Sequence, residues 1–222
     1  MLKFVVTADG SKTLYHPGIG EHYHSRHGAV QESKHVFLGM GLEFCLEQHR
    51  PNAVTVLEIG FGTGLNFLLT ADYCREKGIA LAYTGVEAYP LPAATVSQTA
   101  YDAYVSPALW RSFQLHYADS LLAPQAILGD CLLEIAPRPA LQFTTEKRFD
   151  VLYFDAFAAA HQPELWTVET LRHVCSFLAP GGIFVTYAIT GHLKRTLKAL
   201  GLVIEKVPGA PGKREMLRAV KY

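Results

Sequence analysis

Val54-Thr-Val-Leu-Glu-Ile-Gly-Phe-Gly-Thr-Gly-Leu-Asn66 is the stretch of sequence that decides the fold. Its apolar, β-branched first half, Val54–Ile59, predicts a buried strand. Three glycines follow at alternate positions, and an amphipathic segment then runs from Leu65 to about Lys77. Glycine adopts positive φ angles and lets the backbone approach a ligand without a Cβ in the way. A strand, a glycine turn and a helix in this order predict a site for a nucleotide-like ligand at the helix N-terminus.

The spacing of the glycines distinguishes between possible ligands. A dinucleotide site expects G-x-G-x-x-G, but here Gly64 comes one residue early and Glu58 precedes the first glycine by two positions. This E-x-G-x-G-x-G pattern resembles motif I of methyltransferases that use S-adenosylmethionine (SAM), in which the acid suits the methionyl ammonium of SAM. The alternatives for this stretch are a tight strand–helix turn without a ligand and a dinucleotide oxidoreductase.

Strands and helices alternate through the rest of the chain, which predicts a parallel sheet with helices on both faces. The last two strands are joined by only Pro208–Arg214, too short for a helical crossover, so they should form an antiparallel hairpin. We therefore predict an α/β, Rossmann-like fold with a mostly parallel seven-stranded sheet and a terminal hairpin. The expected strands are Val54–Ile59, Leu81–Val86, Ala126–Leu128, Phe149–Phe154, Ile183–Ala188, Leu202–Val207 and Glu215–Val220, and the expected helices are Leu65–Lys77, Ala93–Tyr104, Cys131–Ile135, Glu164–Leu178 and His192–Leu200.

Residues 1–50 are expected to form an extension that packs on a core domain of residues 51–222. The extension should contain a small hairpin, with strands Phe4–Thr7 and Thr13–Tyr15, and an amphipathic helix over Gly28–Gln48. The sequence contains no signal-peptide pattern and no apolar run near the ~20 residues of a membrane span, which favours a cytoplasmic protein. The four cysteines are widely scattered, so neither a disulfide framework nor a zinc site is expected.

The formal net charge is zero, but the charges are unevenly distributed. Between Lys194 and Tyr222 there are eight basic and two acidic side chains. A basic segment on a neutral protein suits a phosphate-rich partner, although solvated surface lysines explain it equally well. His16, His22, His24 and His27 lie close together, but no acid or cysteine completes a metal set, so a solvated or lid segment is the preferred interpretation.

Acidic residues end three of the expected strands, where ligands of α/β sheets bind. Glu87 is placed to accept hydrogen bonds from ribose hydroxyls. Asp130, with Asp119 as a rival, is placed to accept one from an adenine amino group, or simply to cap a helix. Asp155 follows a strongly apolar strand, where a carboxylate is costly unless solvated or bonded, so it should face the reaction cleft.

The chain resembles the methyltransferase domain of the MnmC family, especially its stand-alone MnmD-like members. The resemblance covers residues 14–219 and depends on several motifs. They are Glu58-Ile-Gly-Phe-Gly-Thr-Gly-Leu-Asn66, Glu87-Ala-Tyr-Pro-Leu91, Asp155-Ala-Phe157, Gln162-Pro-Glu-Leu-Trp166, Pro180-Gly-Gly182, Thr186-Tyr187 and Gly212-Lys-Arg-Glu-Met-Leu217, together with Tyr23-His-Ser25, Gly28, Glu32-Ser33 and Val36-Phe37.

The resemblance implies methyl transfer from SAM to the primary amine of 5-aminomethyl-(2-thio)uridine in the wobble position of tRNA. No second glycine fingerprint is present, so we expect no flavin-dependent oxidase activity. Methylation of a small molecule or a protein is the first alternative, and a non-catalytic SAM- or nucleotide-binding module is another. The chain departs from the family where Ala159 and His161 replace a usual proline and lysine, which affects the loop after Asp155.

The expected roles follow from these motifs. An amine must lose a proton before it attacks the methyl group, and Asp155 is the candidate to accept that proton. No metal and no membrane are expected to take part. The residues expected to bind the cofactor are Glu58, Gly60, Gly62, Thr63, Gly64, Asn66, Glu87 and Asp130, and those expected to bind the substrate are Phe157, Tyr187, Lys213 and Arg214.

Overall fold

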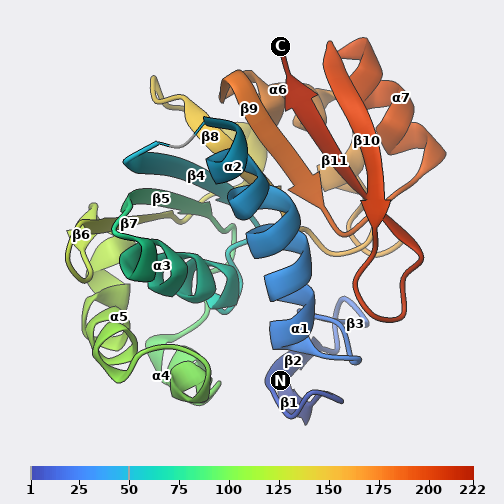
Figure 1. The fold of residues 1–222 in the computed structure, drawn as a ribbon. Coiled ribbons are helices and arrows are strands. Elements are labelled where there is room, and N and C mark those ends of the chain that lie inside the picture. The colour runs from blue at the N-terminus through green and yellow to red at the C-terminus, as the bar shows by residue number, and fades with distance from the viewer. Residues whose placement is uncertain (1, 50) are drawn as a thin grey trace.

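An eight-stranded sheet forms the centre of the protein (Figure 1) in a computed structural model that describes residues 2–49 and 51–222. The strand order is β10-β11-β9-β8-β4-β5-β7-β6. Strands β7, β5, β4, β8 and β9 are parallel, while β11 and β10 form the predicted antiparallel hairpin. The Rossmann-like prediction is confirmed, with one more strand than expected. The strands are β4 (Ala53–Ile59), β5 (Ala80–Val86), β6 (Gln125–Ala126), β7 (Cys131–Ala136), β8 (Phe149–Phe154), β9 (Leu178–Thr186), β10 (Leu202–Pro208) and β11 (Glu215–Lys221).

Helices cover both faces of this sheet, and the side chains of each strand alternate between two hydrophobic clusters. Val56 belongs to the cluster beneath α3 (Leu65–Lys77) and α5 (Pro107–Ser120), whereas its neighbour Leu57 belongs to the cluster beneath α6 (Val168–Ser176) and α7 (Gly191–Ala199). Because both faces are covered, the central strands are mostly apolar, with Glu58 on β4 as a buried exception.

The N-terminal residues form a separate small sheet and then one long helical segment (Figure 1). The small sheet pairs β1 (Lys3–Val6), β2 (Lys12–His16) and β3 (Glu21–His22), so the predicted hairpin has a third strand. The helical segment comprises α1 (Ala29–Ser33), a π-helical stretch η1 (Lys34–Glu43) and α2 (Phe44–His49), in agreement with the predicted helix. Residue 50, the expected domain boundary, lies outside the described residues.

The long helical segment packs directly on the main sheet. Val36 and Phe37 are buried in the same cluster as Val56 and Tyr153. A Cβ at Gly41 would come within 2.8 Å of Val185 on β9, so glycine allows the helix to approach the sheet closely. Among the described residues, no helix is long and apolar enough to cross a membrane.

The helix predicted over Cys131–Ile135 is wrong, because these residues form strand β7. Their buried side chains, Cys131, Leu133 and Ile135, alternate with the half-exposed Leu132, which is the two-residue period of a strand. Asp130 therefore also lies at a different place from the one predicted. It precedes β7 instead of ending a strand, and its carbonyl accepts from the amide of Leu81 at the start of β5, 2.9 Å away.

The helix predicted over Ala93–Tyr104 is shorter than expected. Helix α4 covers only Ala93–Ser97, and Ala100, with a φ of 58°, separates it from the 3-10 turn η2 (Tyr101–Ala103). Helix α5 has no counterpart in the sequence prediction. The remaining short elements are the 3-10 turns η3 (Ala140–Gln142) and η4 (Pro163–Trp166).

Candidate active site

The carboxyl ends of β4, β5, β8 and β9 border a cavity of about 710 Å³. This volume is in the range of small-molecule and cofactor sites. The glycine turn, Glu87, Asp155 and Tyr187 line it from the main sheet, and residues of the segment 16–26 line it from the N-terminal extension. A ligand in the cavity therefore contacts both parts of the chain.

The glycine turn brings the backbone to the cavity wall. Gly60 and Gly62 line the cavity with φ angles of +89° and +53°, which side chains rarely adopt. A Cβ at Gly60 would also clash with the carbonyl oxygen of Asp155. Thr63 and Gly64 lie behind the turn, where the Thr63 hydroxyl is 2.9 Å from the Tyr101 hydroxyl. These last two residues support the turn without lining the cavity.

Glu87 holds the turn in place from the neighbouring strand. Its Oε2 accepts from the amide of Gly62 at 3.0 Å, and its Oε1 accepts from the amide of Tyr89 at 3.0 Å. Each carboxylate oxygen can accept two hydrogen bonds and has one such donor, and Glu87 lines the cavity. Glu87 can therefore still accept from the hydroxyls of a ligand.

Glu58 does not line the cavity, contrary to its expected role as a direct ligand contact. The alternation along β4 places it on the same face as Val56, beneath α3, where it is 1% exposed. Its oxygens accept from the Tyr83 hydroxyl and from Asn66 Nδ2, both at 2.7 Å. Burial, together with the nearby Asp155, raises the pKa of Glu58 well above its usual range.

Asn66 connects this buried carboxylate to the cavity. Its Nδ2 donates to Glu58 at 2.7 Å and to Asp155 Oδ2 at 2.8 Å. Its Oδ1 is a buried acceptor with no hydrogen-bond partner among the described residues, on a side chain that lines the cavity. Because an unsatisfied buried acceptor is costly, this oxygen suits a ligand that brings a donor such as an ammonium group.

Asp155 follows β8 directly and is half-buried at the cavity wall. Its amide donates to the carbonyl of Ile59 at 2.9 Å, which fixes the residue against the glycine turn. Desolvation raises the pKa of Asp155 to about 8, and the negative charge of Glu32 adds to the increase, whereas Asn66 and Lys213 oppose it. A carboxylate with this pKa can take up and release a proton near neutral pH.

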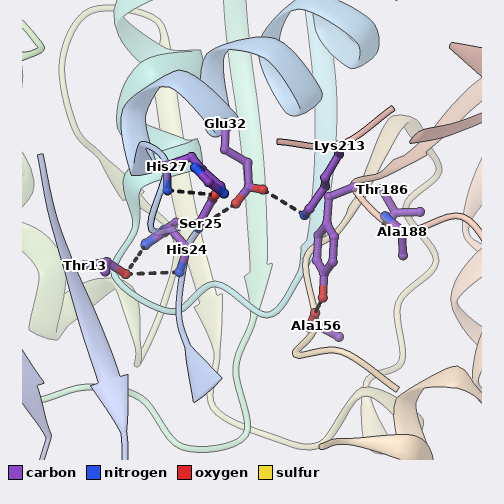
Figure 2. A network of polar contacts seen from close by, with 10 residues as sticks. Thr13, His24, Ser25, His27, Glu32, Ala156, Thr186, Ala188 and Lys213 are labelled. Atoms are coloured by element: carbon purple, nitrogen blue, oxygen red, sulfur yellow. Dashed lines mark hydrogen bonds and ion pairs between the residues drawn. The ribbon is translucent and has the colours of Figure 1, made fainter. Parts of the chain in front are cut away.

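The expected substrate residues separate into two groups. Phe157, Tyr187 and Lys213 line the cavity, while Arg214 is exposed outside it. The Tyr187 hydroxyl donates to the carbonyl of Ala156 at 2.8 Å, and burial raises its pKa. Lys213 belongs to the cavity instead of an outer basic surface, because its Nζ is 3.0 Å from Glu32 Oε2 (Figure 2).

Neither adenine-contact candidate reaches the cavity. Asp130 lies at the amino ends of the strands, at the opposite edge of the sheet. Asp119 lies near the end of α5 and is exposed. The segment after β7 contributes Pro139 and Ala140 to the cavity instead.

Several cavity residues from the N-terminal extension were not predicted. Glu21 accepts from the amide of Ala158 at 2.9 Å, and the ring of Tyr23 lies 5.1 Å from that of Phe157 in an edge-on arrangement. Glu32 is 8% exposed and forms an ion pair with Lys213 in the cavity wall. The sequence signals were the motifs Tyr23-His-Ser25 and Glu32-Ser33, which carried no chemical assignment, and the interpretation of the histidine-rich segment 16–27 as solvated or as a lid.

Comparison with known proteins agrees with this geometry. The model of a family described as S-adenosyl-L-methionine-dependent methyltransferase matches residues 93–222. The chain belongs to this family. Its cofactor is S-adenosylmethionine, and the dinucleotide alternative is set aside.

Similar proteins and solved structures extend the match to nearly the whole chain. The chain is 33% identical, over 94% of its length, to the "tRNA 5-methylaminomethyl-2-thiouridine biosynthesis bifunctional protein MnmC" of Magnetococcus marinus, and 31% identical, over 92%, to that of Burkholderia multivorans. It spans about a third of each relative, 32% and 33%. The crystal structure of MnmC2 from Aquifex aeolicus superposes with a TM-score of 0.78 over 99% of this chain and 70% of that one, at 23% identity, which shows the fold.

The cavity residues of this methyltransferase fit its cofactor. The close approach of Gly60 and Gly62, the lone pairs of Glu87 and the unpaired Oδ1 of Asn66 match a ligand that carries hydroxyl and ammonium donors. When bound, SAM supplies an electrophilic methyl group on a sulfonium. The protein's task is then to hold an acceptor beside that methyl group.

Proposed function

We propose that this methyltransferase methylates the primary amine of 5-aminomethyl-(2-thio)uridine at the wobble position of tRNA. The observation that carries the proposal is the position of Asp155, a carboxylate with a pKa of about 8 in the wall of the cavity. A primary alkylamine is largely protonated at neutral pH and becomes a nucleophile only after it loses that proton. A carboxylate that titrates near neutrality is suited to accept it.

The charge of the cavity supports an amine as the acceptor. Five acidic side chains, Glu21, Glu32, Glu87, Asp155 and Glu164, line it, against two basic side chains, Arg26 and Lys213. An alkylammonium is attracted by such a set, whereas a carboxylate or phosphate acceptor would be repelled. The names of the MnmC relatives, which specify a methylaminomethyl uridine of tRNA, agree with this acceptor.

In this proposal, Glu87 accepts from the ribose hydroxyls of SAM, while the backbone of Gly60 and Gly62 and the side chain of Asn66 hold its methionyl part. Glu58 acts indirectly, because it fixes Asn66, which in turn orients Asp155. The uridine ring would contact Phe157 and Tyr187, and Arg214 would contact a tRNA phosphate.

The test is methyl transfer to tRNA that carries 5-aminomethyl groups, compared with the same tRNA without them. With deuterium-labelled SAM, mass spectrometry of the digested nucleosides should place the labelled methyl on the wobble nucleoside of the first tRNA only. Label in a small-molecule pool or on protein, with none in tRNA, would support the alternative acceptor and reject the proposed one.

A further inference from the structure

The ammonium of Lys213 lies between two groups of the cavity wall. Its Nζ is 3.0 Å from Glu32 Oε2 and 3.9 Å from the centroid of the Tyr187 ring. Figure 2 shows Lys213 and Glu32 pointing toward one another, although they are 181 residues apart in the chain. A cation beside a carboxylate and over an aromatic face is attracted by both.

The two groups that hold this ammonium are fixed by other contacts. The second oxygen of Glu32, Oε1, accepts from the amide of Ser25 at 2.9 Å, and the side chain is nearly buried. The hydroxyl of Tyr187 is bonded to the carbonyl of Ala156 at 2.8 Å. The carboxylate and the ring face are thus presented to the cavity independently of Lys213.

Lys213 is more exposed than the carboxylate that holds it. Its side chain is 36% exposed and belongs to the loop between β10 and β11, and it has a flexible four-carbon stem. Its terminal CH₂–NH₃⁺ is the same chemical group as a primary alkylammonium. If Lys213 moved away, Glu32 would remain as a nearly buried carboxylate, which is costly unless another cation replaces the first.

We propose that Glu32 and the ring face of Tyr187 form an ammonium subsite for which Lys213 and a primary alkylammonium substrate compete. Asp155 lines the same cavity, so an amine held in the subsite lies in the compartment of the proposed base. The aminomethyl group as natural occupant rests on the proposed function, whereas the subsite itself rests on the geometry alone.

Binding of n-butylammonium, measured by NMR titration of the full chain, tests the competition directly. Lys213→Met keeps the length of the side chain and removes the competing charge. We expect it to lower the Kd for n-butylammonium about tenfold, since an intramolecular occupant reduces the apparent affinity by the fraction of free sites. Lys206→Met is the matched control, because Lys206 lies on the same hairpin outside the cavity and should leave the Kd unchanged. The affinity for uncharged n-butanol should be the same in the wild type and both variants.

The increased affinity of Lys213→Met for n-butylammonium must also depend on Glu32. In the double variant Glu32→Gln/Lys213→Met, the Kd for n-butylammonium should return to the wild-type value or above it, in a protein whose melting temperature shows that it is folded. An unchanged or weakened affinity in Lys213→Met, or a gain that persists without Glu32, would overturn the inference. Wild-type methylation of tRNA is measured separately. Tighter n-butylammonium binding without tRNA methylation would reject the proposed acceptor and keep the subsite, and the reverse pattern would reject only the subsite.

Discussion

Individual carboxylates of this protein have different roles because their surroundings differ. Glu58 is buried among side chains, Glu87 is bonded to two backbone amides, and Asp155 is half-buried with one amide donor. All three belong to sequence motifs of the same family, yet only the last two line the cavity. An acidic residue at the end of a strand can contact a ligand only if its side chain is exposed to the cavity. A buried one supports other residues instead.

Replacing Glu87 with Ala should weaken SAM binding at least about tenfold. The substitution removes an acceptor for the ribose and one restraint on the Gly62 amide, and one charged hydrogen bond accounts for about 1.4 kcal/mol. Isothermal titration with SAM measures the effect, with Glu169→Ala on the exposed face of α6 as the control. Unchanged affinity in a folded Glu87→Ala protein would remove Glu87 from the cofactor site.

Asp155→Asn should change how stability depends on pH. The native carboxyl has a pKa of about 8, above the ordinary value of about 3.9 in an unfolded chain, so the native state binds more protons between these pH values. Wild-type stability therefore falls as pH rises from about 4 to about 8, and the Asn variant lacks this loss. The melting temperature of the variant relative to that of the wild type should be higher at pH 9 than at pH 5. The same difference at both pH values would contradict the raised pKa.

At the scale of elements, local periodicity predicted much of the fold. The strand Val54–Ile59, the glycine turn and the helix Leu65–Lys77 combine apolar runs, glycines and amphipathic spacing, which suffice to specify them. The helix predicted over Cys131–Ile135 is wrong because Asp130 is typical of a helix cap, whereas the burial of Cys131–Ala136 alternates with the two-residue period of a strand. The helix predicted over Ala93–Tyr104 ends early because Ala100 adopts a left-handed conformation that alanine does not signal.

Two kinds of signal predicted the site, namely acidic residues at strand ends and family motifs, which supplied Asn66 and Lys213. Glu87 and Asp155 follow apolar strands, and the parallel order of the sheet brings their carboxylates to one edge. Glu21, Tyr23 and Glu32 could not be assigned, because they reach the cavity through packing of the N-terminal extension on a sheet more than twenty residues away in the chain. No local pattern encodes that contact.

Because Cys131–Ala136 form strand β7 instead of a helix, a further prediction concerns Asp130. Asp130→Ala should leave SAM affinity within about twofold of the wild type, because Asp130 lies at the amino ends of the strands, across the sheet from the cavity. The same titration used for Glu87→Ala provides the measurement. A loss comparable with that of Glu87→Ala would place Asp130 back in the site and would require a different course for residues 125–136.

For the whole molecule, ion pairs neutralise three of the basic side chains that the C-terminal segment was expected to offer to a polyanion. Lys213 pairs with Glu32, Arg218 with Glu205, and Lys206 with Glu215. Within the described part of the chain, five bases of this segment have no ion pair, and one of them, Lys221, donates to the backbone carbonyls of Cys175 and Leu178. The other four are Lys194, Arg195, Lys198 and Arg214. Any electrostatic contact with a polyanion from this segment therefore depends first on these four.

Arg214→Ala should weaken tRNA binding and make it less sensitive to salt. Loss of one phosphate contact reduces the slope of log K against log salt by about 0.7–0.9, because fewer counterions are released. Fluorescence titrations of tRNA at several salt concentrations give that slope. Lys77→Ala, at the far end of α3 from the glycine turn, is the control. If Arg214→Ala matches the wild type in both slope and affinity, this arginine is only solvated.

The central claim is that Asp155 removes the proton from an amine held in the cavity, and single-turnover methylation of 5-aminomethyl tRNA by Asp155→Asn tests it most directly. At pH 7 we predict a rate about 10²–10⁴-fold below that of the wild type, with SAM affinity within about twofold, because general-base assistance is lost while the shape is kept. Above about pH 8, where Asp155 of the wild type is already ionised, the variant's deficit should shrink as more of the amine becomes neutral. Near-normal turnover of Asp155→Asn at pH 7 would contradict the claim and show that solvent takes the proton.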